Sequence, residues 1–245
     1  MYPQTHVFFA EAILKKQRDH IALGSILPDI LVGCDISHCE AHSQGMDIFK
    51  MISQESYLKD FGLAVASHGF VPRGLDYFGD EKYLDYEKGY CFEKARQLIL
   101  KTVEVCNIPP EMGWWKAHNI VEMGVETLVS STDHYSEQIK SALNNIGLID
   151  DVDELLNDLW QDKELNFAVR MRRFAKFVEI EKASPESLAK KFQLQMQVKH
   201  KVDINVTKVA RLIGEAAELV TQDINEFFRN SLGIVKKNIA NMDQD

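Results

Sequence analysis

The chain has 245 residues, of which 45% are hydrophobic and 27% charged, and its formal net charge at pH 7 is -9. This composition is typical of a globular protein and excludes a disordered chain, while the acidic balance disfavours general nucleic-acid binding, which needs a basic surface. With only six prolines and thirteen glycines, the chain has few turn residues for an all-β protein of this size.

The first residues show no basic region followed by an apolar stretch, so we expect no secretory signal. No apolar run approaches the roughly 20 residues that cross a bilayer, and we expect no transmembrane segment. The four cysteines, Cys34, Cys39, Cys91 and Cys106, form no CxxC pair. Reduced thiols in a cytoplasmic protein are the simplest interpretation.

Hydrophobic residues recur at helical spacing through most of the chain. In chain order, helices are predicted over residues 5–19, 38–53, 57–70, 86–106, 112–131, 148–162, 164–183, 184–200 and 206–239. Residues 24–33 are predicted to break the first helical region, because Pro28 disfavours a helical conformation at Leu27. Residues 71–83 carry a proline and two glycines and are predicted to form a loop.

This pattern predicts an all-α protein, a multi-helix bundle with additional C-terminal helices. Six of the eight histidines fall within the first 118 residues. We therefore expect a metal-binding helical core at residues 1–145 and a C-terminal helical part at residues 146–245 that packs on the core or extends from it. The sequence indicates neither the role of this second part nor the oligomeric state.

Two pairs of polar residues have the four-residue spacing that puts side chains on one face of a helix. His38 and His42 form HCEAH, and His118 and Glu122 form HNIVE. Imidazole and carboxylate groups at this spacing can share a metal ion. The alternatives are a solvated polar helix start for the first pair and a simple surface hydrogen bond for the second.

Four further residues are candidates because of their surroundings. His68 lies in the apolar segment FGLAVASHGF, and Asp29 interrupts the apolar segment ILPDILV. Asp76 follows His68 by eight residues, and His6 lies in the first predicted helix. Alternatively, His68 is a hydrogen-bonded core histidine, Asp29 and Asp76 cap local structure, and His6 has no special role.

Taken together, the candidates come from separate helices, and a bundle that turns them inward would form a carboxylate and imidazole cage. These ligand types suit a divalent ion, most simply zinc, with iron or manganese as alternatives. The residues concerned are His6, Asp29, His38, His42, His68, Asp76, His118 and Glu122.

The order of the motifs resembles the zinc-dependent phospholipase C and S1/P1 nuclease superfamily. An early Thr-His is followed by GSILPDI, a histidine cluster, an apolar helix with a histidine, and HNIVE, all within about residues 5–125. The resemblance implies an all-helical fold that holds up to three zinc ions between helices and hydrolyses phosphodiesters or phosphomonoesters.

Carried over to this chain, the resemblance makes His6 the early ligand and Asp29 the bridging aspartate beside the attacking water. His38 or His42 would be the next ligand, His68 would come from the central helix, and His118 with Glu122 would close another site. The chain departs from the family pattern in three ways. It begins MYPQTH and not with a processed tryptophan, Pro72 stands where the aspartate of HxxxD is expected, and FGDEKYLDYEKG contains no further histidine. We therefore expect one or two ions.

The predicted function is metal-dependent hydrolysis of a small phosphoric ester, with water activated by the metal as the nucleophile. Asp29 would orient or deprotonate that water, and Arg73, between His68 and Asp76, would contact the phosphate. One alternative is an HD-type helical phosphohydrolase, although Asp133-His134 has the reverse order. The other is a non-catalytic metal-binding scaffold that presents its C-terminal helices to a partner.

Overall fold

A computed structural model describes residues 1–33, 35–52, 56–131, 134–163 and 165–242. Within these ranges every regular element is a helix, so the all-α prediction is confirmed. Cys34 and Asp133 lie outside the described residues. No described helix combines the length and the apolar character needed to cross a lipid bilayer.

The first 130 residues contribute α1 to α8, and the rest of the chain contributes the remaining helices. Their bounds are α1 Pro3–Leu14, α2 Asp19–Leu31, α3 His38–Ser43, α4 Gly45–Met51, α5 Lys59–Ala66, α6 Tyr90–Ala95, α7 Ile99–Cys106, α8 Gly113–Ser130, α9 Tyr135–Asn144, α10 Ile146–Leu159, α11 Phe167–Phe177, α12 Pro185–His200, α13 Val206–Thr221 and α14 Ile224–Met242. Short helical turns precede α6, separate it from α7, and precede α8.

The predicted break at residues 24–33 is wrong, because α2 runs through Pro28 to Leu31. The cost of an interior proline is outweighed by burial, since Ile26 and Leu27 of α2 are fully buried. Helix α2 also packs so closely on α5 that a Cβ at Gly24 would lie 2.4 Å from a backbone oxygen of α5. Tertiary packing therefore decides the conformation of this segment.

Other boundaries also differ from the prediction, and two of them are of interest here. The loop expected at residues 71–83 ends early, because residues 75–81 are helical and include a π-helical turn at Tyr77–Glu81. The single helix expected at residues 206–239 is two helices, which meet at Gln222 and Asp223. The π-helical turn matters for the site, because it carries polar side chains toward the centre of the molecule.

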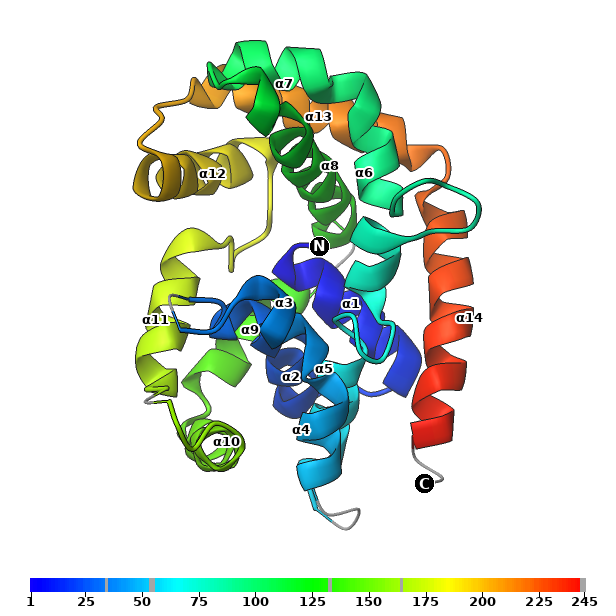
Figure 1. The fold of residues 1–245 in the computed structure, drawn as a ribbon, viewed down its shortest axis with the longest axis vertical. Coiled ribbons are helices and arrows are strands. Elements are labelled where there is room, and N and C mark those ends of the chain that lie inside the picture. Colours follow the sequence, from blue (N-terminus) through cyan, green and yellow to red (C-terminus); the bar gives the residue numbers. More distant parts are fainter. Residues whose placement is uncertain (34, 53–55, 132–133, 164, 243–245) are drawn as a thin grey trace.

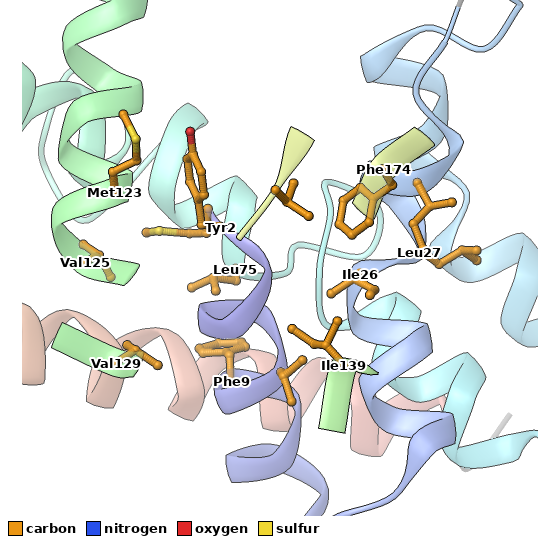
Figure 2. Packing of buried hydrophobic residues seen from close by; sticks show 14 of the residues in the cluster. Tyr2, Phe9, Ile26, Leu27, Leu75, Met123, Val125, Val129, Ile139 and Phe174 are labelled. Atoms are coloured by element: carbon orange, nitrogen blue, oxygen red, sulfur yellow. The ribbon is translucent and has the colours of Figure 1, made fainter. Parts of the chain in front are cut away.

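Helix α1 crosses the middle of the molecule, with α2 and α5 on one side and α8 on the other (Figure 1). Helix α13 packs along α8, α11 against α2, and α14 against α1. One hydrophobic cluster runs from Met1 to Met242 through both halves of the chain. Figure 2 shows part of it, with Phe174 of α11 in the same cluster as Leu27 of α2.

Candidate metal centre

Three groups of histidine and carboxylate side chains each bring ligand atoms within 4.8 Å of one another. We call them cluster one (Asp29, His42 and His68), cluster two (His6, His68 and Asp76) and cluster three (Asp80, His118 and Glu122). Clusters one and two share a histidine, so they form one continuous centre.

Cluster one joins the end of α2, helix α3 and the turn after α5. The Nε2 atom of His42 lies 3.6 Å from Oδ1 of Asp29. The other ring nitrogens are held by backbone carbonyls: Nδ1 of His42 lies 2.9 Å from the oxygen of His38, and Nδ1 of His68 lies 2.5 Å from that of Ser25. A carbonyl that accepts from Nδ1 fixes the tautomer in which Nε2 is free to bind a metal.

Cluster two is arranged around Asp76, whose side chain is only 3% exposed. Its carboxylate lies 3.3 Å from Nε2 of His6, 3.1 Å from Nε2 of His68 and 3.2 Å from Nε2 of His42. The rings of His6 and His68 are stacked with centroids 3.6 Å apart. Asp76 therefore links clusters one and two, although no sequence pattern indicated that it is buried.

A closed loop brings Asp76 back beside His68 although eight residues separate them. The backbone N–H of Asp76 donates to the carbonyl of His68 at 2.8 Å, and Gly74 donates to Gly69 at 2.8 Å. Gly69 also lies against α3, where an added Cβ would be 2.1 Å from the carbonyl oxygen of His42. The loop thus connects both histidines of cluster one to Asp76, and only glycine fits at residue 69.

Cluster three lies between the π-helical turn and α8. Nε2 of His118 is 2.8 Å from Oδ1 of Asp80 and 3.3 Å from Oε1 of Glu122. The His118 ring stacks on Phe92 of α6, with the centroids 4.0 Å apart. All three members of the cluster are buried, so the HNIVE pair faces the interior and is not a surface hydrogen bond.

The amino group of Met1 lies between the clusters. Its nitrogen is 2.7 Å from Oδ1 of Asp76 and 2.7 Å from Oε1 of Glu122. Burial lowers the pKa of this amine, but the surrounding carboxylates raise it by more, and the net shift is well above the usual value. The ammonium form therefore neutralises part of the negative charge of clusters two and three.

Glu126 holds the amino end of α1, the helix that carries His6. Its carboxylate accepts from the backbone N–H groups of Gln4 and Thr5, both at 2.9 Å, and from the Thr5 hydroxyl at 2.7 Å. Burial raises the pKa of Glu126 to about 7, although these hydrogen bonds oppose the shift. Since Tyr2 supplies no side-chain cap, Glu126 of α8 caps α1 from outside.

The protonation states within the centre differ between its histidines. Burial lowers the pKa of His42, but the carboxylates of Asp29 and Asp76 raise it by more, to about 10. Burial and the neighbouring His6 lower the pKa of His68 to about 4. Burial also opposes ionisation of both aspartates, yet the cationic groups around them outweigh it and lower their pKa values.

The centre contains buried ring nitrogens that form no aligned hydrogen bond to a described residue, although Nε2 of His6, His42 and His68 lies at ion-pair distance from Asp76. The nitrogens concerned are both ring nitrogens of His6, Nε2 of His42, Nε2 of His68 and Nδ1 of His118. Leaving buried polar atoms without an aligned hydrogen bond is costly. Nitrogen atoms that face carboxylate oxygens in this way are a suitable ligand set for a divalent transition metal, so the residues fit the metal that the sequence predicts.

A cavity of about 560 Å³ opens over the centre. Its floor includes members of all three clusters, among them Asp29, Asp76 and His118. Asp29 is the member of cluster one that reaches the cavity, and its side chain is 27% exposed. The size is that of a small-molecule site, and Trp115 at its edge is 62% exposed.

The structure brings most of the sequence candidates together. His6, Asp29, His42, His68, Asp76, His118 and Glu122 belong to the clusters. His38 lines the cavity but belongs to none of them, and its ring stacks on His42 with centroids 3.9 Å apart. Arg73 is exposed, stacks on Tyr77 with its guanidinium carbon 4.6 Å from the ring centroid, and does not line the cavity.

Sequence reasoning missed Asp80, the Met1 amine and Glu126. Asp80 lies four residues after Asp76, a helical spacing that becomes visible only once residues 75–81 are recognised as helical. Glu126 continues the series His118, Glu122 along α8 at the same four-residue spacing, which was a usable signal. No sequence pattern indicated the position of the amine.

Comparison with family models, curated proteins and solved structures finds no match to this chain.

Proposed function

We propose that the protein is a metal-dependent hydrolase of phosphoric esters. The observation that carries this proposal is the position of three buried histidine and carboxylate clusters at the floor of one cavity of about 560 Å³. Purely structural ion pairs do not need to open onto a cavity of ligand size. Buried imidazoles that face carboxylates beneath that cavity favour a site that binds a metal and acts on a ligand.

A divalent ion at these clusters would supply Lewis-acid activation of water and neutralise charge on the phosphoryl oxygens. The chain's own groups have distinct tasks. The carbonyls of His38 and Ser25 orient the rings of His42 and His68, and Glu126 keeps His6 in place through α1. Asp29 reaches the cavity and would accept the proton of the attacking water.

We further propose zinc as the metal and the zinc-dependent phospholipase C and S1/P1 nuclease superfamily as the chain's distant relatives. Clusters one and two each contain two histidines, which supports zinc. The ligands come from separate helices, which supports the relationship. Clusters one and two share His68, and its Nδ1 is held by Ser25, so its single free nitrogen can bind one ion. We therefore propose one ion at this shared centre and one at cluster three, within the one or two expected from the sequence. Asp80 stands near the place where the family pattern has its further histidine.

The test is elemental analysis of protein purified without added metal, followed by assay of the zinc-loaded protein on bis(4-nitrophenyl) phosphate and 4-nitrophenyl phosphate. His118→Ala should lose metal from cluster three and at least about 100-fold in activity, because a ligand of the reactive centre is removed. His20→Ala is the matched control, because His20 lies outside the clusters and its ring contacts Tyr57.

Equal metal content in wild type and His118→Ala would contradict the assignment of His118. Metal-loaded protein that hydrolyses neither ester would overturn the hydrolase proposal, and the non-catalytic metal-binding scaffold would then be the better description. The described residues do not support the HD-type alternative, because the ring of His134 contacts Gln17 and Glu11 and belongs to none of the three clusters.

A further inference from the structure

Part of the cavity lining, which we call the wall, comes from the second half of the chain. Helices α11 and α12 supply the apolar residues Phe174, Phe177 and Val198, and the basic residues Arg173 and Lys199. None of these residues belongs to a cluster. The metal centre and the wall therefore come from different parts of the sequence and face one shared space.

The basic residues of this wall differ in what they contact. Arg170 also lines the cavity, but its guanidinium donates to the carbonyls of Leu165 and Leu31, both at 2.8 Å, and pairs with Asp35 at 2.5 Å. Arg173 and Lys199 are exposed, and no described carboxylate lies within ion-pair distance of either. Arg170 thus fixes α11 to the end of α2, while the other two charges face solvent and the cavity.

A further lysine, Lys116, lies near Lys199. Nζ of Lys116 lies 2.9 Å from Nε2 of His200, and burial together with the charge of Lys199 lowers the pKa of Lys116. A protein with a formal net charge of -9 therefore has two cations, Arg173 and Lys199, that line its cavity and pair with no described carboxylate, and Lys116 lies close enough to Lys199 to interact with it. Like charges held together without a counter-ion repel one another, and a bound anion would relieve that repulsion.

We propose that this wall selects a phosphoric ester that carries a second anionic group, separated from the scissile phosphate by an apolar or aromatic segment. The inference rests on the proposed function for the position of the phosphate at the clusters. Trp115, Phe177 and Val198 would contact the apolar segment, and Arg173 and Lys199 would pair with the distal anion. Attraction at a partly exposed site is weakened by salt, so the preference falls as ionic strength rises.

The test uses titration calorimetry to measure how tightly the zinc-loaded protein binds two non-hydrolysable probes. These are 2-naphthylmethylphosphonate and its 6-sulfonate derivative. In the wild type, the sulfonate should bind at least about tenfold more tightly, a difference of about 1.4 kcal/mol. The double variant Arg173→Ala with Lys199→Ala should reduce that ratio to within about threefold. The double variant Arg172→Ala with Lys190→Ala removes two exposed charges from the same helices outside the cavity and should keep the wild-type ratio.

A ratio near one in the wild type, an unchanged ratio in the Arg173 and Lys199 variant, or no binding of either probe would overturn the proposal. Failure of this proposal can be distinguished from failure of the proposed function by combining binding and hydrolysis measurements. If the probes bind with the expected ratio but the corresponding naphthyl phosphates are not hydrolysed, the result would support the role proposed for the wall and contradict the hydrolase proposal. If both phosphates are hydrolysed with no preference for the sulfonate, only the role proposed for the wall would be contradicted.

Discussion

His42 and His68 occupy the same centre but hold their protons differently. The pKa of His42 is raised to about 10 by Asp29 and Asp76 despite its burial, so in the metal-free protein it is charged at neutral pH. Burial and His6 lower the pKa of His68 to about 4, so it is neutral there. The charge of His42 stabilises the metal-free fold below the unfolded pKa, near 6.5, and this contribution is lost as pH rises through 10.

This difference predicts how metal affinity depends on pH. A metal must displace the proton of His42, so between pH 6 and 9 the apparent zinc affinity should rise by about tenfold per pH unit from this group alone. Titration calorimetry in two buffers of different ionisation enthalpy measures the released protons. His42→Ala should bind more weakly and release one proton fewer. His68→Ala should bind more weakly without that loss, and equal proton release from both variants would contradict the prediction.

Glu126 affects the metal centre indirectly, because it holds the helix that carries His6. Glu126→Gln replaces an acceptor of three hydrogen bonds with an amide, one end of which would face backbone donors. We expect a loss of about 1–3 kcal/mol in the free energy of unfolding and weaker zinc binding, because α1 carries His6. Urea unfolding at pH 7.5 checks the first effect. Glu137→Gln, an exposed residue on α9, should change neither quantity, and wild-type stability of Glu126→Gln would exclude the capping role.

Among the elements, the loop that follows α5 is the most constrained. A Cβ at Gly69 would lie 2.1 Å from the carbonyl of His42, and Phe70 donates to the same carbonyl at 2.6 Å. Gly69→Ala should therefore push α3 away from the turn that carries His68. We expect a loss of about 1–3 kcal/mol in stability and at least tenfold weaker zinc binding, as measured by chemical unfolding and metal titration.

Gly147→Ala is the matched control for this substitution. Gly147 lies in α10, where a Cβ would meet nothing within 4 Å, and a helical glycine replaced by alanine should gain about 0.5–1 kcal/mol. If Gly69→Ala binds zinc as the wild type does, the loop does not set the distance between His42 and His68.

The elements also show what sequence reasoning could and could not reach. Helical periodicity is local, and it correctly predicted an all-α chain and placed His118 and Glu122 on one face of a helix. The backbone conformation at Pro28 depends on packing against α5, which is distant in the chain. A rule that considers only neighbouring residues therefore predicted a break where α2 continues. The burial of Asp76 and the position of Asp80 depend on the closed loop and the π-helical turn. The sequence made Asp76 a candidate without indicating its burial, and no local pattern indicated Asp80.

At the scale of the molecule, both halves of the chain contribute to the cavity and to the core. Clusters one to three lie within the first 122 residues, but the face of α8 away from them is covered by α13. The two helices approach so closely that a Cβ at Gly124 would lie 2.7 Å from the backbone nitrogen of Ala217. On the other side, Phe174 packs into the cluster that contains Ile26 and Leu27, as Figure 2 shows.

This arrangement predicts that residues 1–145 do not form the metal centre alone. Removing the rest would expose apolar surface on α8 and α2, and burial of such surface is the main favourable term in folding. The fragment should show reduced helicity by circular dichroism, no cooperative thermal transition, and zinc affinity at least tenfold below that of residues 1–242, which retain every described helix. A fragment that melts cooperatively and binds zinc as tightly as the longer chain would show that α1 to α9 fold independently. The second half would then serve the cavity wall alone.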